Sequence, residues 1–268
     1  MQKKLKALSE KVPSLTIALG FFAPIGFFYI LTKAPVNSFS LELFLYIFLN
    51  SILAFISFTP LHEACHKNIQ GNHKSLETLE NTIGYLSGFV LGIPFPLFRV
   101  QHLAHHSFVN DPKKDPDYWV ASSNPLQLVF RCLTILPAHY VHFCKNPSKR
   151  GKKLILNTIG INLLLLLSAS LIIYLSGLPR LIFLWLLPSV LGLGFLGFSF
   201  DWLPHHPHQE KSRYLNARLF QSRYLDVVLL MQNLHLIHHL YPRIPFHQYR
   251  RAYELLLPEL IENNCKIV

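Results

Sequence analysis

Histidine is the residue type in this 268-residue chain that most clearly could do chemistry. Fifteen histidines are present, and eight of them fall into three short clusters. These clusters are HEACH from His62, HLAHH from His102 and HLIHH from His235. Residues three and four positions apart share one face of a helix, so each cluster can direct two or three imidazoles to one place. The spacing therefore predicts metal binding.

The number of imidazoles indicates more than one metal ion. A structural zinc takes four ligands and a catalytic zinc takes three with a water, so eight histidines are about twice what one zinc can use. Imidazole also binds iron, copper and nickel, so the residues alone leave the metal open. A di-iron site built from them would be of a histidine-rich membrane type, unlike the carboxylate-rich sites of soluble bundles.

The composition indicates which kind of element must hold these histidines. Hydrophobic residues make up 51% of the chain and charged residues only 15%, which is typical of a membrane protein. The 25 lysines and arginines outnumber the 14 acidic residues, a balance that points to membrane topology and anionic lipid and not to nucleic acid. Four cysteines without a CxxC pair predict neither a disulfide framework nor a thiolate zinc site.

Four uncharged apolar runs predict helices that cross a membrane. They cover residues 12–32, 43–61, 154–179 and 181–200, and roughly 20 helical residues are enough to span the hydrocarbon core. Short links join them into two transmembrane hairpins, and the lysines before the first run indicate an anchor rather than a cleaved signal. A fifth run, Asn81 to Phe98, contains Pro94 and Pro96 and predicts a dipping or interfacial helix.

The distribution of basic residues predicts the orientation. With the N-terminus in the cytoplasm, only Lys33 and Arg180 of the 25 basic residues would lie outside, as the positive-inside rule expects. We therefore predict one all-α integral membrane domain over residues 1–268, with both termini cytoplasmic. The histidine clusters would lie in the cytoplasmic parts 62–153 and 201–268, which would form a helical cap around a di-metal site.

Taken with this topology, the three clusters resemble the histidine boxes of the membrane fatty acid desaturase and hydroxylase superfamily. Within it, four longer strings resemble the β-carotene ring hydroxylases related to desaturases. These strings are HHSFVNDPKKDPD from His105, DWLPHHPH from Asp201, NARLFQSRYLD from Asn216 and QNLHLIHHLYPRIPFHQYRRAYE from Gln232. The resemblance covers His62 to Glu254, and it departs from the branch at Glu63, where aspartate is more usual.

The resemblance implies two iron ions, with O2 as co-substrate and an external electron donor. It implies nine iron ligands, of which the ninth follows the fourth span at His205, with His206 and His208 as alternatives. The implied ligands are His62, His66, His102, His105, His106, His205, His235, His238 and His239.

Metal-bound imidazoles commonly donate their second N–H to a carboxylate or carbonyl. We predict Asp111 as the main partner of this kind, since it leads a turn that also contains Asp115 and Asp117. Asn233 and Gln232, beside the third box, are further candidates. A surface helix is predicted over residues 126–143, which places its two histidines outside the site.

The resemblance implies hydroxylation of a carotenoid β-ionone ring. The alternative is an acyl-chain desaturase acting on membrane lipid or a thioester, because both reactions begin with the same hydrogen abstraction. HExxH at His62 also matches a zinc metalloprotease with Glu63 as general base, but that function leaves both HxxHH boxes unused. A metal carrier would place its ligands near the bilayer midplane, whereas the boxes lie at the ends of the apolar runs.

Partners follow from the same features. An apolar substrate would enter from the lipid between the hairpins. Electrons must come from outside, because the sequence has no flavin or nicotinamide fingerprint. Most of the basic surface is explained by topology and anionic lipid, and part of it could dock an acidic ferredoxin-like donor.

Overall fold

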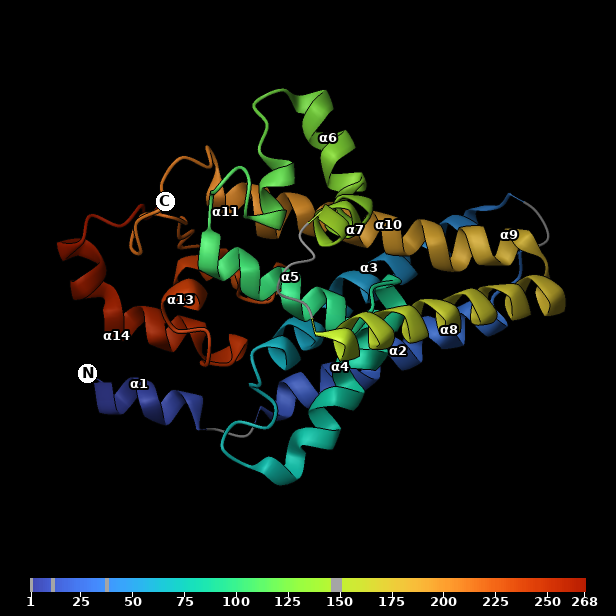
Figure 1. Cartoon of the computed structure of the whole chain (residues 1–268), viewed down its shortest axis with the longest axis horizontal. Coiled ribbons are helices and arrows are strands. Elements are labelled where there is room, and N and C mark those ends of the chain that lie inside the picture. The colour runs from blue at the N-terminus through green and yellow to red at the C-terminus, as the bar shows by residue number, and fades with distance from the viewer. Residues whose placement is uncertain (1, 11–12, 37–38, 146–150) are drawn as a thin grey trace.

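The computed structural model describes residues 2–10, 13–36, 39–145 and 151–268. Its regular elements over these ranges are helices, apart from one isolated bridge between Leu219 and Ile267. The long apolar helices α2 and α3 follow a short N-terminal helix α1. In Figure 1, helices α13 and α14 lie with α1 at the end of the molecule opposite α9. The first bounds are α1 Gln2–Ser9, α2 Ser14–Lys33 and α3 Leu41–Cys65.

Among the described residues, four helices are long and apolar enough to cross a membrane, which agrees with the predicted number. They are α2, α3, α8 (Lys152–Ser176) and a continuous helix over Leu178–His205. That last helix comprises α9 Leu178–Leu181, a π-helical turn Ile182–Leu186, α10 Leu187–Leu196, a second π-helical turn Gly197–Trp202 and α11 Leu203–His205. Position 12, the predicted start of the first span, lies outside the described residues.

Helix α3 continues beyond the predicted end of its apolar run. Ser40 caps its N-terminus by accepting a hydrogen bond from the Leu43 amide at 3.2 Å, and the helix then runs through Pro60 to Cys65. An apolar window detects only the lipid-facing part of a helix, whereas the hydrogen-bonded spiral persists into the polar segment. His62 consequently lies on the helix, and His66 is its C-cap residue.

The fifth apolar run forms two helices instead of the predicted single one. Helix α4 (Glu77–Leu91) and helix α5 (Phe95–Phe108) meet at an angle of 93°. Gly92 ends α4 with a left-handed backbone, φ 68°, which glycine adopts without steric cost. Pro94 and Pro96 then restrict the chain at the start of α5. Because of this bend, α5, which carries the second histidine box, runs nearly perpendicular to α4.

Close packing fixes α3 against the fourth apolar helix. A Cβ atom on Gly192 of α10 would lie 2.9 Å from the Cβ of Ala54 on α3, so the two backbones can approach only because residue 192 has no side chain. Nearby, the Asn50 amide donates to the Leu184 carbonyl at 2.8 Å. Small residues and buried hydrogen bonds of this kind are how helices associate in lipid. The contact sets the position of the first histidine box.

The remaining elements lie toward the polar part of the molecule. They are short helices η1 Lys74–Leu76, η2 Pro116–Val120, α6 Pro125–Leu133 and α7 Ile135–Lys145, then α12 Arg223–Val228, η6 Gln232–Leu234, α13 His235–Leu240, η7 Phe246–Gln248 and α14 Tyr249–Glu262. Leu5 and Leu8 of α1 join Tyr249 and Leu256 of α14 in a second apolar cluster. Helices α1, α13 and α14 are therefore held together by their own core.

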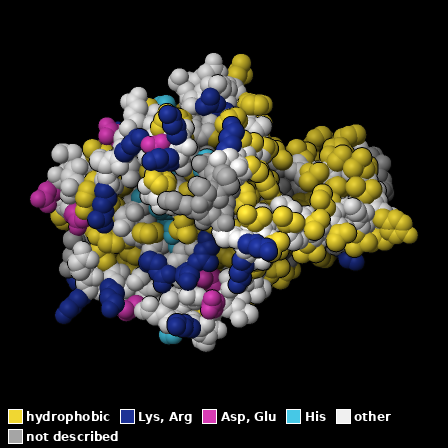
Figure 2. Space-filling view, viewed as in Figure 1, with side chains coloured by type: hydrophobic (Ala, Val, Ile, Leu, Met, Phe, Trp, Pro, Cys, Tyr) yellow, Lys and Arg dark blue, Asp and Glu magenta, His cyan; other side chains and the backbone are white. Residues whose placement is uncertain are grey.

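The surface divides by chemistry along the long axis. Figure 2 shows an end covered almost entirely by hydrophobic side chains, while lysine and arginine gather over the opposite half. On α8, Leu166 and Leu167 are 64% and 67% exposed, a pattern that a helix facing lipid produces and that water would penalise. These features are compatible with a multi-pass membrane protein.

Candidate metal centre

The nine predicted ligands come from four helices that meet at one place. His62 and His66 end α3, His102, His105 and His106 lie on α5, and His205 is the last residue of α11. His235, His238 and His239 lie on α13. The structure brings all nine imidazoles together, although the four segments are far apart in sequence.

The imidazoles divide into two groups, each with its ligand atoms within 4.8 Å of one another. The five-histidine group is His62, His66, His102, His106 and His238, and the four-histidine group is His105, His205, His235 and His239. The HxxHH boxes are therefore shared between the groups. Residues four apart, such as His102 and His106, point to one group, while the histidine between them points to the other.

The spacing within each group is that of ligands around a common ion. In the five-histidine group, Nε2 of His62 lies 3.0 Å from Nε2 of His238, and Nε2 of His66 lies 2.8 Å from that of His102. In the four-histidine group, Nε2 of His239 lies 2.9 Å from that of His235. Nitrogens bound about 2.1 Å from one ion at right angles would be about 3 Å apart.

In His205, the hydrogen bond on the other ring nitrogen leaves Nε2 free to bind a metal. Nδ1 of His205 lies 2.8 Å from the Asn216 carbonyl oxygen, which can only accept, so Nδ1 carries the proton and Nε2 carries a lone pair. This Nε2 atom is buried and has no hydrogen-bond partner among the described residues. A buried lone pair beside three more imidazoles fits a metal ion. The residues present therefore fit the implied di-metal centre.

Burial keeps the three predicted ligands on α13 neutral. It lowers the pKa of His235, His238 and His239 well below the usual range, and the neighbouring imidazoles lower these pKa values further. Metal binding needs the unprotonated ring. These three imidazoles are accordingly unprotonated at neutral pH, the form that binds a metal.

The carboxylate that orients a ligand is Asp115, and the prediction of Asp111 was wrong. Nδ1 of His105 donates to Oδ1 of Asp115 at 2.9 Å. Asp111 instead accepts from the Lys113 and Lys114 amides, 3.0 and 3.1 Å away, and pairs with Lys211 at 2.9 Å. Aspartate at the start of a turn commonly caps the following amides, and this local bonding turns Asp111 away from the imidazoles.

The two amide candidates beside box three do not hold a ligand either. The Asn233 side chain donates to the Phe220 carbonyl and to Asp226, both at 2.8 Å. Gln232 is buried, and its side chain has no hydrogen-bond partner within the described ranges. Asn233 therefore stabilises the chain around α12.

Sequence reasoning missed the contribution of α7. His139 is buried, and its Nε2 lies 2.8 Å from Oδ1 of Asp117, whose other oxygen is 3.3 Å from Nδ1 of His105. The predicted surface helix 126–143 breaks at Thr134 into α6 and α7. The i, i+3 spacing of His139 and His142 could have indicated that this helix contributes to the site, but the apolar residues around them favoured a surface helix.

Hydrogen bonds within the protein engage the Glu63 carboxylate, which would be the general base of a zinc metalloprotease. Its two carboxylate oxygens accept from the Asn68 side chain and from the Phe246 amide, each at 3.2 Å. His62 and His66, the two ligands of an HExxH site, belong here to a group of five histidines. Both observations count against the protease.

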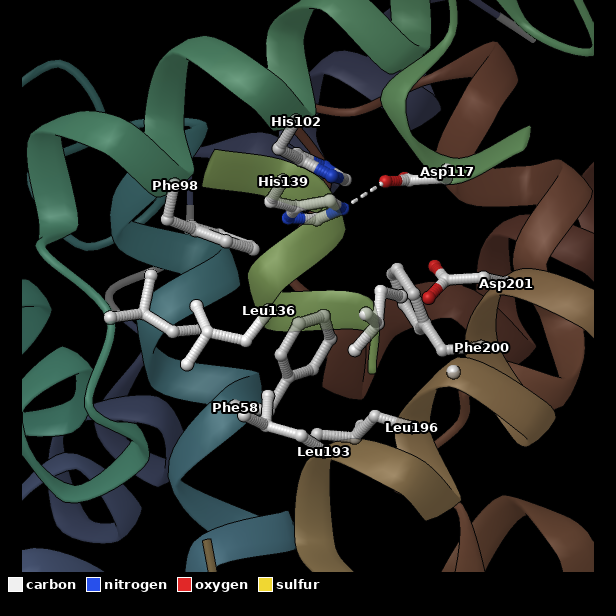
Figure 3. A pocket seen from close by; sticks show the side chains of 13 residues that line it. Phe58, Phe98, His102, Asp117, Leu136, His139, Leu193, Leu196, Phe200 and Asp201 are labelled. Atoms are coloured by element: carbon white, nitrogen blue, oxygen red, sulfur yellow. Dashed lines mark hydrogen bonds and ion pairs between the residues drawn. The ribbon is translucent and has the colours of Figure 1, made fainter. Parts of the chain in front are cut away.

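A cavity of about 30 Å³ adjoins the five-histidine group at His102. In Figure 3, Phe58, Phe98, Phe200 and Leu193 form its apolar side, while Asp117, His139 and Asp201 lie toward its polar side. We call it the metal cavity. Among the nine predicted ligands, His102 is the one that lines this cavity.

Comparison with known proteins places this site in a family. The model of the family described as "Fatty acid desaturase" matches residues 39–267. Dihydrorhizobitoxine desaturase from Bradyrhizobium elkanii is 26% identical over 237 residues, covering 75% of this chain and 64% of that protein. The chain thus matches less than two thirds of this relative. Because the family match covers most of the chain and includes every histidine of both groups, the chain belongs to the fatty acid desaturase family.

Proposed function

We propose that the chain is an oxidoreductase that uses two iron ions and O2 to oxidise a C–H bond of a lipophilic substrate. The observation that carries this proposal is the division of nine imidazoles into groups of five and four. One zinc needs at most four ligands, so a mononuclear enzyme would leave about half of these imidazoles buried without purpose. Bound iron would supply the activation of O2 that the protein side chains cannot supply.

The residues of the chain orient the ligands and enclose the substrate. Asp115 and the Asn216 carbonyl fix the ring orientation of His105 and His205. The Tyr249 hydroxyl lies 2.9 Å from Nδ1 of His238 and fixes the ring orientation of this member of the five-histidine group. Phe58 and Phe200 keep water from the reacting segment, which raises the selectivity for one C–H bond.

We favour desaturation of an acyl chain as the reaction. The description of the family and the name of the relative both support it, and the apolar lining of the metal cavity suits a polymethylene segment. Hydroxylation of a carotenoid β-ionone ring is the second candidate, because the strings around His105, Asp201 and Gln232 resemble that branch. Ligand geometry serves both reactions equally.

The proposal includes a single membrane domain with the histidine boxes and both termini in the cytoplasm, and an acidic ferredoxin-like protein as electron donor. The concentration of lysine and arginine over one half of the molecule supports both parts. Electron transfer from such a donor would weaken as salt rises, because exposed charges are screened.

Product analysis in cells that make β-carotene tests the reaction. New double bonds in acyl lipids with unchanged pigment are the expected result. Hydroxylated pigment with unchanged acyl chains would replace desaturation by the second candidate. Unchanged pigment and unchanged lipids, with the protein present in the membrane and loaded with iron, would overturn the proposal.

A further inference from the structure

Helix α7 contributes side chains to the metal cavity and to two other cavities. Ile135, Leu136 and His139 on one face of the helix line the metal cavity. Pro137 and Val141, on another face, line a cavity of about 770 Å³ that we call the outer cavity. A helix with its side chains is about 10 Å wide, so the two cavities are close neighbours.

The lining of the outer cavity combines basic and aromatic side chains. Lys113, Arg131 and Lys145 line it together with Trp119 and Phe130, and the Arg131 guanidinium lies 5.6 Å from the Trp119 ring centroid. Over the described ranges none of these three cations forms a salt bridge.

The one carboxylate in the wall of this cavity is already occupied. Asp115 accepts from His105, from the Asn110 amide at 2.8 Å and from the Asp117 amide at 2.9 Å. The positive charge of the outer cavity is therefore left for an external anion. Lysine and arginine over aromatic rings suit a phosphate group.

The exposed apolar side chains of α6 indicate that the outer cavity lies at the level of lipid headgroups. Leu126, Val129 and Phe130 of this short helix are 84%, 57% and 60% exposed, while Arg131 faces the cavity. An amphipathic helix with exposed leucine and phenylalanine, next to a tryptophan, is typical of the membrane interface. A soluble protein surface would not carry this apolar stripe without cost.

An apolar groove of about 560 Å³ adjoins both cavities. It shares Pro137 with the outer cavity and shares Leu136 and Leu193 with the metal cavity. Leu166 of α8 and Trp185 of the fourth apolar helix form its walls. We call it the lipid groove, since it lies between two helices that carry exposed leucines.

We propose that the outer cavity binds the phosphate of a membrane glycerophospholipid, with an acyl chain of that lipid lying in the lipid groove and reaching the metal cavity. This inference rests on the proposed function and names its substrate as an acyl chain still esterified to phospholipid. The groove faces the helices that contact lipid, and the cationic cavity lies beside it at the interface. A soluble thioester would need neither α6 nor an opening toward lipid.

Binding of phosphatidylglycerol to the purified full chain in detergent tests the proposal without requiring turnover. Native mass spectrometry with short-chain phosphatidylglycerol measures the affinity. We expect the double substitution Lys113→Gln and Arg131→Gln to weaken binding at least fivefold. The matched control, Lys74→Gln with Arg213→Gln, removes the same charge from exposed positions elsewhere and should leave the affinity unchanged.

A charge-conserving variant separates binding from folding. Arg131→Lys loses the hydrogen bond from the guanidinium to the Ala121 carbonyl but keeps the charge, and it should retain affinity within about twofold. Equal loss in Arg131→Lys and Arg131→Gln, or equal loss in the control pair, would overturn the proposal. So would binding of oleoyl-coenzyme A that depends on Lys113 while phosphatidylglycerol does not bind.

The result is distinguishable from failure of the proposed function. Phospholipid binding that depends on Lys113 and Arg131, in a protein without iron or oxidase activity, would keep the site and reject the reaction. Desaturation of acyl lipids with no effect of either substitution on binding would keep the reaction and reject the site.

Discussion

His105 connects the four-histidine group to two carboxylates, which makes it the most informative single ligand. Its Nδ1 atom contacts Asp115 and Asp117, and its Nε2 atom lies 3.3 Å from Nε2 of His239. We expect His105→Ala to abolish product and to reduce bound metal from two ions toward one. His73→Ala, at an exposed position, should change neither. Full activity in His105→Ala would contradict the site.

Asp115 and Asp111 form a matched pair of carboxylates in one turn. Asp115→Asn removes the charge that stabilises the His105 N–H, so iron affinity should fall about 10- to 100-fold. Asp111→Asn changes a side chain that is 27% exposed and pairs with Lys211, so affinity should stay within about twofold. Competition with a chelator measures both values, and a larger effect at Asp111 would reject our assignment.

Residue types and spacing predicted eight of the nine histidines that the structure brings together, and the family resemblance added His205. Neither predicted how the nine divide into two groups. The boxes could be predicted because the helical spacing of three and four residues is visible in a short stretch of sequence. The contact of Asp115 with His105 could not be predicted, because Asp111 lies in the same turn and hydrogen bonds to nearby amides decide which carboxylate faces the histidines.

Helix α3, which carries the first histidine box, packs so closely on α10 that the contact leaves little room for a larger side chain. Gly192→Ala would place a Cβ 2.9 Å from that of Ala54, and overpacking of this kind costs about 1–3 kcal/mol. The thermal unfolding temperature in detergent should fall by roughly 2–4 °C per kcal/mol. Adding Ala54→Gly to this variant should restore part of the lost stability.

Gly160 on α8 is the control for that substitution. A Cβ there would meet nothing within 4 Å, so Gly160→Ala should leave thermal unfolding unchanged or slightly raised, because alanine favours a helix. A comparable loss of stability at both glycines would mean that helix packing at Gly192 is not the cause.

Apolar runs predicted the four long helices because lipid requires continuous hydrophobic length. The sequence did not predict the sharp bend between α4 and α5 or the division of residues 126–143 into two helices. Pro94 indicated an interruption near the bend, but the angle between the two helices also depends on the backbone of Gly92. Thr134 gave no comparable signal for the second, so the burial of His139 came only from the tertiary structure.

At the scale of the whole molecule, metal should stabilise the fold, since four separate segments converge on the ligands. A ligand that binds only the folded state adds free energy that grows with its concentration over Kd. We therefore expect removal of iron with a strong chelator to lower the thermal unfolding temperature, and re-addition to restore it. Differential scanning fluorimetry measures this. An unchanged temperature after verified metal loss would show that the imidazoles hold their places without the ion.

The metal content of the purified chain tests the central claim most directly. Elemental analysis by mass spectrometry, normalised to protein concentration, should give two iron ions per chain, one for each histidine group. A single zinc ion per chain, in protein that is folded and inserted in membranes, would contradict it.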